Sequence, residues 1–254
     1  MLTTEFFSRG WRLPWRRKPR TVAVFSFRYD AHLVPDLIEN LRPMVDGYIS
    51  YDDRAATDLF SSEPERRALL IRAARDTGAR WVLYMDPDQR LEQAAAQEMP
   101  KLTKAEGPVA WGFRLRELYA PDVYRNDGAW GRKIRYRLFP LLDGQEFGTQ
   151  ALHEQHYPKG YERRKTDLNL YHLKMITRER REGRRDLYKV LDPEGQYQAM
   201  GYDYLADEEG AEFKKIAKRR AFLPPHKEDG GLWMPEVELG EAARQPAQGQ
   251  DKPG

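Results

Sequence analysis

Two carboxylates stand one residue apart at Asp86 and Asp88, directly after the apolar run 81–85. The run is short and aromatic and ends at charge and proline, which predicts a buried strand. A strand that ends in Asp-Pro-Asp presents oxygen ligands at the carboxyl edge of a sheet, where open α/β folds bind their ligands. Such ligands suit Mg²⁺ or Mn²⁺, which bind through one or two carboxylates together with substrate phosphates. Asp and Pro also favour turns, so the motif alone leaves open a plain turn that ends the strand.

The elements that would position these carboxylates alternate between strands and helices. Strands are predicted over 22–26, 47–51, 81–85 and 109–115, and helices over 33–41, 63–77 and 91–102. This alternation is typical of βαβ units, so we expect an α/β fold with a mostly parallel sheet flanked by helices. Later in the chain we expect strands over 135–142 and 167–173 and helices over 176–191 and 204–220.

Composition narrows the class of protein. The 254 residues carry 43 basic and 40 acidic side chains, a balance that argues against a nucleic-acid partner. The absence of cysteine excludes disulfides, thiolate nucleophiles and cysteine zinc sites, and it fits a cytoplasmic protein. No stretch approaches the roughly 20 apolar residues that cross a bilayer. We therefore expect a cytoplasmic location, with peripheral contact at the inner membrane surface as a further option.

The two ends of the chain differ in composition from its middle. Residues 1–20 interleave aromatic and basic side chains, which suits an anionic membrane surface or an acidic partner. The alternative is that these aromatic residues dock on the protein's own core. Residues 21–173 carry the alternating elements, and 174–235 are predicted to form a helical extension. Residues 236–254 are rich in Gln, Gly, Pro and Glu and are predicted to be disordered.

The order of the motifs resembles that of a known enzyme family. A strand ending in Asp52-Asp53 is followed by WVLYMDPDQRLE, RYRLFPLL, LHE and LYH. Over residues 21–173 this order is similar to the first half of an inverting family 2 glycosyltransferase with the GT-A fold, a Rossmann-like mixed sheet. The resemblance implies transfer of a sugar from a nucleotide-diphosphate donor to the hydroxyl of a glycan, lipid-linked or protein acceptor. It also implies an Asp-x-Asp motif that holds a divalent cation against the donor's diphosphate.

On this resemblance, Asp88 is the expected metal ligand, and Asp86 is a second ligand or a contact to the nucleotide. A divalent cation would stabilise the departing diphosphate as a Lewis acid. His172 could complete the metal shell through a neutral imidazole, and the alternative is a histidine packed at the end of a strand. Gln89 departs from the acidic residue that relatives often carry at this position, and an amide cannot act as a base.

Inversion also needs a base that takes the proton of the acceptor hydroxyl. Glu154, next to His153, is the candidate, and the alternative is that it pairs with one of the many arginines. Nucleotide recognition is expected after the first two strands and on the following helix, where a carboxylate can accept a base N–H and arginine can bind phosphate. The residues expected there, besides Asp86, are Ser26, Arg28, Asp30, Asp52, Arg66 and Arg67.

The helix predicted after His172 carries Arg178, Arg180, Arg181, Arg184 and Arg185. These arginines fit either a solvated helix face or a basic wall against an anionic ligand.

Two other functions stay open for the whole chain. One is an inactive binding module on the same scaffold, which Gln89 motivates because a fold does not guarantee activity. The other is a membrane- or polyanion-binding adaptor that works through residues 1–20.

Overall fold

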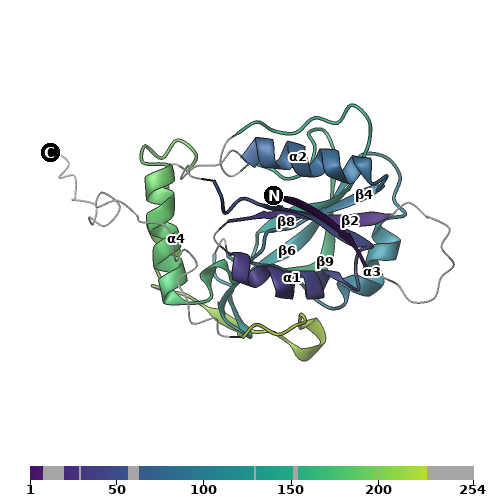
Figure 1. The fold of residues 1–254 in the computed structure, drawn as a ribbon. Helices are drawn as coiled ribbons and strands as arrows, with labels where there is room; N and C mark the ends of the chain where they lie inside the picture. The colour runs from purple at the N-terminus through teal and green to yellow at the C-terminus, as the bar shows by residue number, and fades with distance from the viewer. Residues whose placement is uncertain are drawn as a thin grey trace.

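The computed structural model describes residues 1–7, 20–28, 30–56, 63–128, 130–150, 154–198 and 200–227. In this part of the chain one mixed sheet carries helices on both faces (Figure 1). The strands are β1 (Leu2–Phe6), β2 (Thr21–Phe27), β3 (Gly47–Asp52), β4 (Trp81–Tyr84), β5 (Gln89–Leu91), β6 (Val109–Ala120), β7 (Val123–Arg125), β8 (Ile134–Pro140), β9 (Glu162–His172) and β10 (Phe213–Lys215). The α-helices are α1 (Val34–Leu41), α2 (Glu63–Asp76), α3 (Ala95–Leu102) and α4 (Arg178–Leu191).

The order of the strands corrects one prediction. The sheet runs β1-β3-β2-β4-β8-β6-β7-β10, and β9 joins it by pairing with β6 and β5. Parallel pairing is confined to β2 with β3, β2 with β4 and β6 with β9, within the described residues. All other strand pairings among the described residues are antiparallel. The α/β class is confirmed, but the sheet is not mostly parallel, because neighbours such as β6 and β7 are joined by tight turns and not by helical crossovers.

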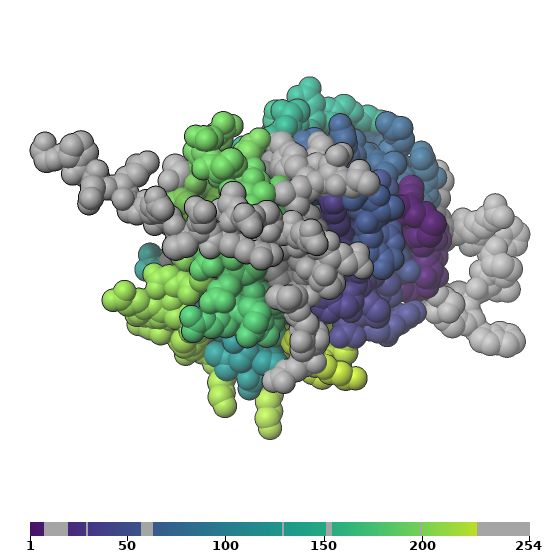
Figure 2. All heavy atoms as spheres, turned by 60° about the vertical axis from the view of Figure 1, so that its left-hand side comes forward, coloured from purple at the N-terminus to yellow at the C-terminus, as the bar shows by residue number. Residues whose placement is uncertain are grey.

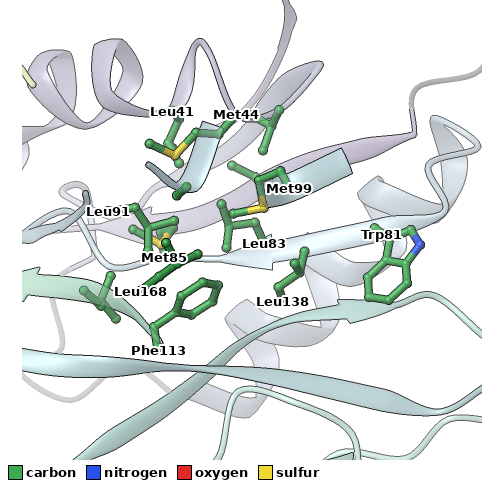
Figure 3. Close-up of a cluster of buried hydrophobic side chains, with 14 of the residues drawn as sticks. Leu41, Met44, Trp81, Leu83, Met85, Leu91, Met99, Phe113, Leu138 and Leu168 are labelled. Carbon is green, nitrogen blue, oxygen red and sulfur yellow. The ribbon is translucent and has the colours of Figure 1, made fainter. Parts of the chain in front are cut away.

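The parallel centre of the sheet follows directly from its sequence. The strands β2, β3 and β4 are rich in β-branched and aromatic residues and are buried on both faces. Helices α1 and α3 cover one face and α2 covers the other (Figure 1). Figure 3 shows the first of these interfaces, where Leu83 and Leu138 of the sheet share a cluster with Leu41 of α1 and Met99 of α3.

Two helix predictions differ from the structure. Leu91, expected in a helix, pairs with Leu170 in β5, and α3 begins only at Ala95. The helix expected over 204–220 is absent; β10 and short 3₁₀ turns occupy that segment. Gly210 has a φ of 66° there, which no α-helix contains, and the pairing of β10 with β7 replaces the local helical preference. In its described residues, the extension after residue 173 is therefore α-helical in α4 and otherwise helical only in 3₁₀ turns.

The N-terminal residues join the fold in part. Strand β1 pairs with β3, and Phe7 is 8% exposed, with its ring 5.9 Å from that of Tyr48. Phe6 is 49% exposed. Positions 8–19 and 228–254 lie outside the described residues, so the predictions of a membrane-binding leader and a disordered tail stay predictions. No described helix has the length and apolar character needed to span a membrane.

Candidate functional site

A cavity of about 510 Å³ lies at the carboxyl ends of the parallel strands β2, β3 and β4. Ser26 at the end of β2, Asp53 after β3 and Asp86 after β4 line it. Strands β8 and β9 add side chains from their ends at the same edge, and α4 lines another wall. Figure 2, turned so that the α4 end comes forward, shows α4 and the segment after it as green and yellow-green spheres on this side of the molecule. This is the sheet edge at which α/β folds place their ligands.

The Asp-Pro-Asp segment both ends the strand and faces the cavity. The backbone N–H of Gln89 donates to the carbonyl of Asp86 at 3.0 Å, which closes a turn, and Asp86 and Asp88 both line the cavity. The Gln89 side chain is 1% exposed, and its Nε2 donates to Asp86 Oδ2 at 2.6 Å. Arg137 Nη2 donates to the same oxygen at 2.6 Å. Gln89 therefore orients Asp86, which is a positioning role and needs no carboxylate.

His172 links two carboxylates. Its Nε2 lies 3.3 Å from Asp88 Oδ1, and its Nδ1 lies 2.8 Å from Glu117 Oε2. Burial opposes the charged imidazole, but Glu117 and Asp88 raise the pKa of His172 to about 9. Burial would raise the pKa of Asp88, yet His172 and Arg184 hold it far below its usual range. At neutral pH the free protein thus holds an imidazolium between two carboxylates.

The carboxylate of Asp88 and the imidazole of His172 fit a divalent cation that is also bound by phosphate. An imidazole and a carboxylate point at each other, and Glu117 sits behind His172 as carboxylates do behind metal-bound histidines. In the described ranges no group of three or more His, Asp or Glu side chains could hold a metal by itself. The residues therefore suit a cation that takes its other ligands from a bound phosphate, as Mg²⁺ and Mn²⁺ do. Binding would require His172 to lose its proton.

Helix α4 brings Arg184 to the cavity and anchors itself through Arg180. Thr177 caps its first turn by accepting from the backbone N–H of Arg180 at 3.2 Å. Arg180, 1% exposed, donates to Asp30 Oδ1 at 2.7 Å. Arg184 Nη2 lies 3.0 Å from Asp30 Oδ2 and 3.2 Å from Asp88 Oδ2. One turn of the helix thus separates an anchoring arginine from one that reaches the predicted metal ligand.

The α4 arginines divide between an inner and an outer side of the helix. Arg180, Arg181 and Arg184 point inward, and the first two are almost fully buried. Arg178 is 77% exposed and forms a local ion pair with Glu182, four residues later. Arg184 therefore faces the cavity from the inner side of α4, Arg178 lies on a solvated outer side, and a basic wall against an anionic ligand stays a prediction.

Most of the predicted nucleotide-binding side chains meet at the cavity. Those that line it are Ser26, Arg28, Asp30, Arg66 and Asp86. Asp52 does not; it forms an ion pair with Arg54 at 2.7 Å, and the next residue, Asp53, faces the cavity instead. Successive side chains of a strand alternate between faces, so a shift of one residue decides which carboxylate is presented. Asp53 is 6% exposed and pairs with Arg66 at 3.3 Å.

Arg67 also lies away from the cavity. It is 2% exposed, and its guanidinium donates to the backbone carbonyls of Gly148 and Gln155. Arg67 therefore supports the loop that carries Glu154 and does not face a phosphate. Its burial follows from its position on the inner face of α2, next to Leu70 and Ile71.

Glu154 reaches the cavity from this loop. Its carboxylate accepts the backbone N–H of Gln155 at 2.8 Å and of Gln150 at 3.0 Å. Burial would raise the pKa of Glu154, but these N–H groups hold it below its usual value, so the carboxylate is ionised at neutral pH. Among the residues that the structure describes, no arginine forms an ion pair with Glu154. Its neighbour His153 lies outside the described residues.

His156, which sequence reasoning missed, also lines the cavity. Its Nε2 lies 3.8 Å from Asp86 Oδ1, and its ring meets that of Tyr84 edge-on at 4.6 Å. Burial and the nearby Arg137 lower the pKa of His156 to about 3, so its imidazole is neutral. The signal in the sequence is a second histidine two residues after Glu154. Glu117 was missed as well, although it stands out as an acidic residue within the long apolar strand β6.

Comparisons with known proteins give distant structural likenesses. No protein-family model matches this chain, and no curated protein does. A solved structure described as a glycosyltransferase involved in the glycosylation of the major capsid of PBCV-1 is similar, with a TM-score of 0.31 and 13% sequence identity. The match covers 49% of this chain and 61% of that one. This likeness is too distant to support any statement about function.

Proposed function

We propose that this chain is a metal-dependent, inverting glycosyltransferase of the GT-A type, similar to family 2 enzymes, that moves a sugar from a nucleotide-diphosphate donor to an acceptor hydroxyl. One observation carries the proposal. Asp88 and His172, backed by Glu117, lie side by side in a cavity at the carboxyl ends of the parallel strands. These positions are far apart in the sequence, and a turn that merely ended β4 would not require them to converge.

The chain's own groups divide the work of binding the donor. Asp88 and His172 would hold the cation, which would supply Lewis-acid stabilisation of the diphosphate as it departs. Asp86, fixed by Gln89 and Arg137, would face the nucleotide. Ser26, Arg28, Arg66 and Asp53 line the part of the cavity after β2 and β3, where the nucleoside would lie.

The acceptor needs a base on the same cavity. Glu154 is ionised at neutral pH and lines the cavity, so it can accept the proton of an acceptor hydroxyl. His156 is the second candidate because its imidazole is neutral and can also accept a proton. Displacement by the acceptor from the face opposite the diphosphate would invert the anomeric carbon.

A thermal-shift screen tests the donor site. Nucleoside diphosphates and nucleotide-sugars are titrated with and without Mn²⁺ on the wild type and on Asp88→Asn, and Glu39→Gln on the outside of α1 serves as control. A ligand at about 100 times its Kd should stabilise the fold by roughly 2.7 kcal/mol. We expect a shift that needs Mn²⁺, is lost in Asp88→Asn and is kept in Glu39→Gln. If no nucleotide shifts the wild type, the transferase proposal is wrong.

Turnover separates an enzyme from an inactive module on the same scaffold. The nucleotide-sugar that gives the largest shift is incubated with the protein and Mn²⁺, and release of the nucleoside diphosphate is followed over time. Release that Asp88→Asn abolishes supports the enzyme. Metal-dependent binding with no release, with or without added acceptor sugars, supports the inactive module.

A further inference from the structure

Both carboxylate oxygens of Asp88 are already occupied in the free protein. Oδ1 faces His172 Nε2 at 3.3 Å, and Oδ2 faces Arg184 Nη2 at 3.2 Å. The backbone of Asp88 is fixed as well, since its carbonyl accepts the N–H of Leu173 at 2.7 Å. Because the Asp88 side chain is only 6% exposed, it cannot turn a free oxygen toward the cavity without rearrangement. A cation that binds through Oδ2 must therefore displace the guanidinium of Arg184, and a cation held between Oδ1 and His172 lies close to this guanidinium and repels it.

Arg184 has a second carboxylate to hold it nearby. Its Nη2 lies 3.0 Å from Asp30 Oδ2, while the other oxygen of Asp30 is held by Arg180 at 2.7 Å. A guanidinium that leaves Asp88 thus stays tethered beside the cavity by Asp30 and by helix α4. It then faces a divalent cation on Asp88, and like charges at this distance repel strongly in a buried site.

An incoming diphosphate resolves this repulsion. Guanidinium groups bind phosphate oxygens with paired, charge-assisted hydrogen bonds. A diphosphate that shares its oxygens between the cation and Arg184 would separate the two positive charges and give each of them a partner. The same group that blocks the cation in the free protein would then hold the diphosphate in the complex.

We propose that Arg184 is a diphosphate-binding residue that the free protein keeps on Asp88, so that the cation and the diphosphate are taken up together. The diphosphate half of this inference rests on the proposed function, whereas the competition between Arg184 and a cation rests only on the ion pairs at Asp88. Such coupling is reciprocal: the cation raises diphosphate affinity by the factor by which the diphosphate raises cation affinity.

Isothermal titration calorimetry tests both halves with simple probes. Mn²⁺ alone and inorganic pyrophosphate in the presence of Mn²⁺ are titrated into the wild type, Arg184→Gln and Arg178→Gln. Arg178 is the matched control because it lies on the same helix, is 77% exposed and forms a local ion pair with Glu182. We expect Arg184→Gln to bind Mn²⁺ alone at least tenfold more tightly and pyrophosphate with Mn²⁺ at least tenfold more weakly. Arg178→Gln should match the wild type in both titrations.

The opposite signs of the two changes exclude damage to the fold, which would weaken both. Arg184→Lys keeps the positive charge, so it should bind Mn²⁺ alone as weakly as the wild type does. The proposal is overturned if Arg184→Gln leaves Mn²⁺ affinity unchanged or lowers it, or if Arg184→Lys gains Mn²⁺ affinity as Arg184→Gln does. Failure of the transferase proposal looks different: no nucleotide or pyrophosphate binds the wild type, while the Mn²⁺ titrations still respond to Arg184.

Discussion

Glu63 differs from the other carboxylates that line the cavity. Asp86 and Asp88 have arginine or histidine partners that keep their pKa values low. Burial, helped by the charge of Asp86, raises the pKa of Glu63 to about 7, and its Oε2 has no hydrogen-bond partner in the described structure. Glu63 therefore carries a proton in the folded protein under conditions where the unfolded chain has lost it.

This difference predicts a pH dependence with a definite sign. Between the ordinary pKa of 4.5 and about 7 the folded state binds more protons at Glu63 than the unfolded state. Below pH 4.5 Glu63 is protonated in both states and its burial does not lower the free energy of unfolding. As the pH rises from 4.5 to about 7, the free energy of unfolding falls by up to about 3 kcal/mol. Glu63→Gln removes the titration, so urea unfolding at pH 5 and pH 8 should show the variant gaining stability relative to the wild type at pH 8. An equal difference at both pH values would contradict the prediction.

Single residues also mark where sequence reasoning about the site succeeds. Asp86 and Asp88 were predictable because a strand end and a proline fix both their place and their exposure. Glu117 and His156 were not, since their roles come from contacts with His172 and Asp86, which are distant in the sequence. Asp53 was missed in favour of Asp52 because the alternation of a strand near its end depends on where the pairing stops.

Gly148 and Gln155 are the described residues that surround the candidate base, Glu154. The carboxyl group of Glu154 lies over Gly148, and a Cβ placed on this glycine would overlap it. Arg67 donates hydrogen bonds to the backbone carbonyls of Gly148 and Gln155, on either side of Glu154. Since the obstructed group is the end of a flexible side chain, a methyl group at position 148 should move the Glu154 carboxylate and leave the backbone of Gly148 and Gln155 in place.

Gly148→Ala is therefore expected to lower turnover at least tenfold while Mn²⁺-dependent nucleotide affinity stays within about twofold, because general bases contribute roughly 10²–10⁴-fold. Donor turnover and calorimetric binding measure the two effects. Gly144→Ala is the control: its φ is 67° and nothing lies near its Cβ, so it strains the backbone without touching Glu154. If Gly148→Ala keeps full turnover, Glu154 is not the base, and His156→Asn becomes the variant to test.

Longer elements were largely predictable, and short ones were not. The strands β2, β3 and β4 and the helices α1 and α2 follow from apolar runs and helix-stop residues such as Gly78. Strands β5, β7 and β10 have three residues each, and they exist only because a partner strand is brought beside them. The same dependence explains why a helix was expected where β10 forms, since its pairing with β7 is not encoded locally.

At the scale of the whole molecule, Asn40 joins three distant parts of the chain. Its Nδ2 donates to the carbonyl of Leu91 at 2.9 Å and to that of Leu223 at 2.8 Å. Its Oδ1 accepts the backbone N–H of Leu91 at 2.9 Å. Nearby, Arg220 pairs with the fully buried Glu92 at 2.8 Å. The segment after α4 is thereby fastened to α1 and β5, as well as to the sheet through β10.

These contacts predict that the extension unfolds together with the sheet. Asn40 is 2% exposed, so Asn40→Ala would leave the buried N–H and carbonyl of Leu91 without their Asn40 partner and would remove the bond to the part-buried carbonyl of Leu223. Each such group costs about 1–3 kcal/mol, and we expect a loss of roughly 2–4 kcal/mol in one cooperative urea transition. Glu39→Ala, on the exposed side of α1, should change stability by less than about 0.5 kcal/mol. A separate early transition in Asn40→Ala would instead mean that the C-terminal segment folds as an independent unit, held to the sheet mainly by this one side chain.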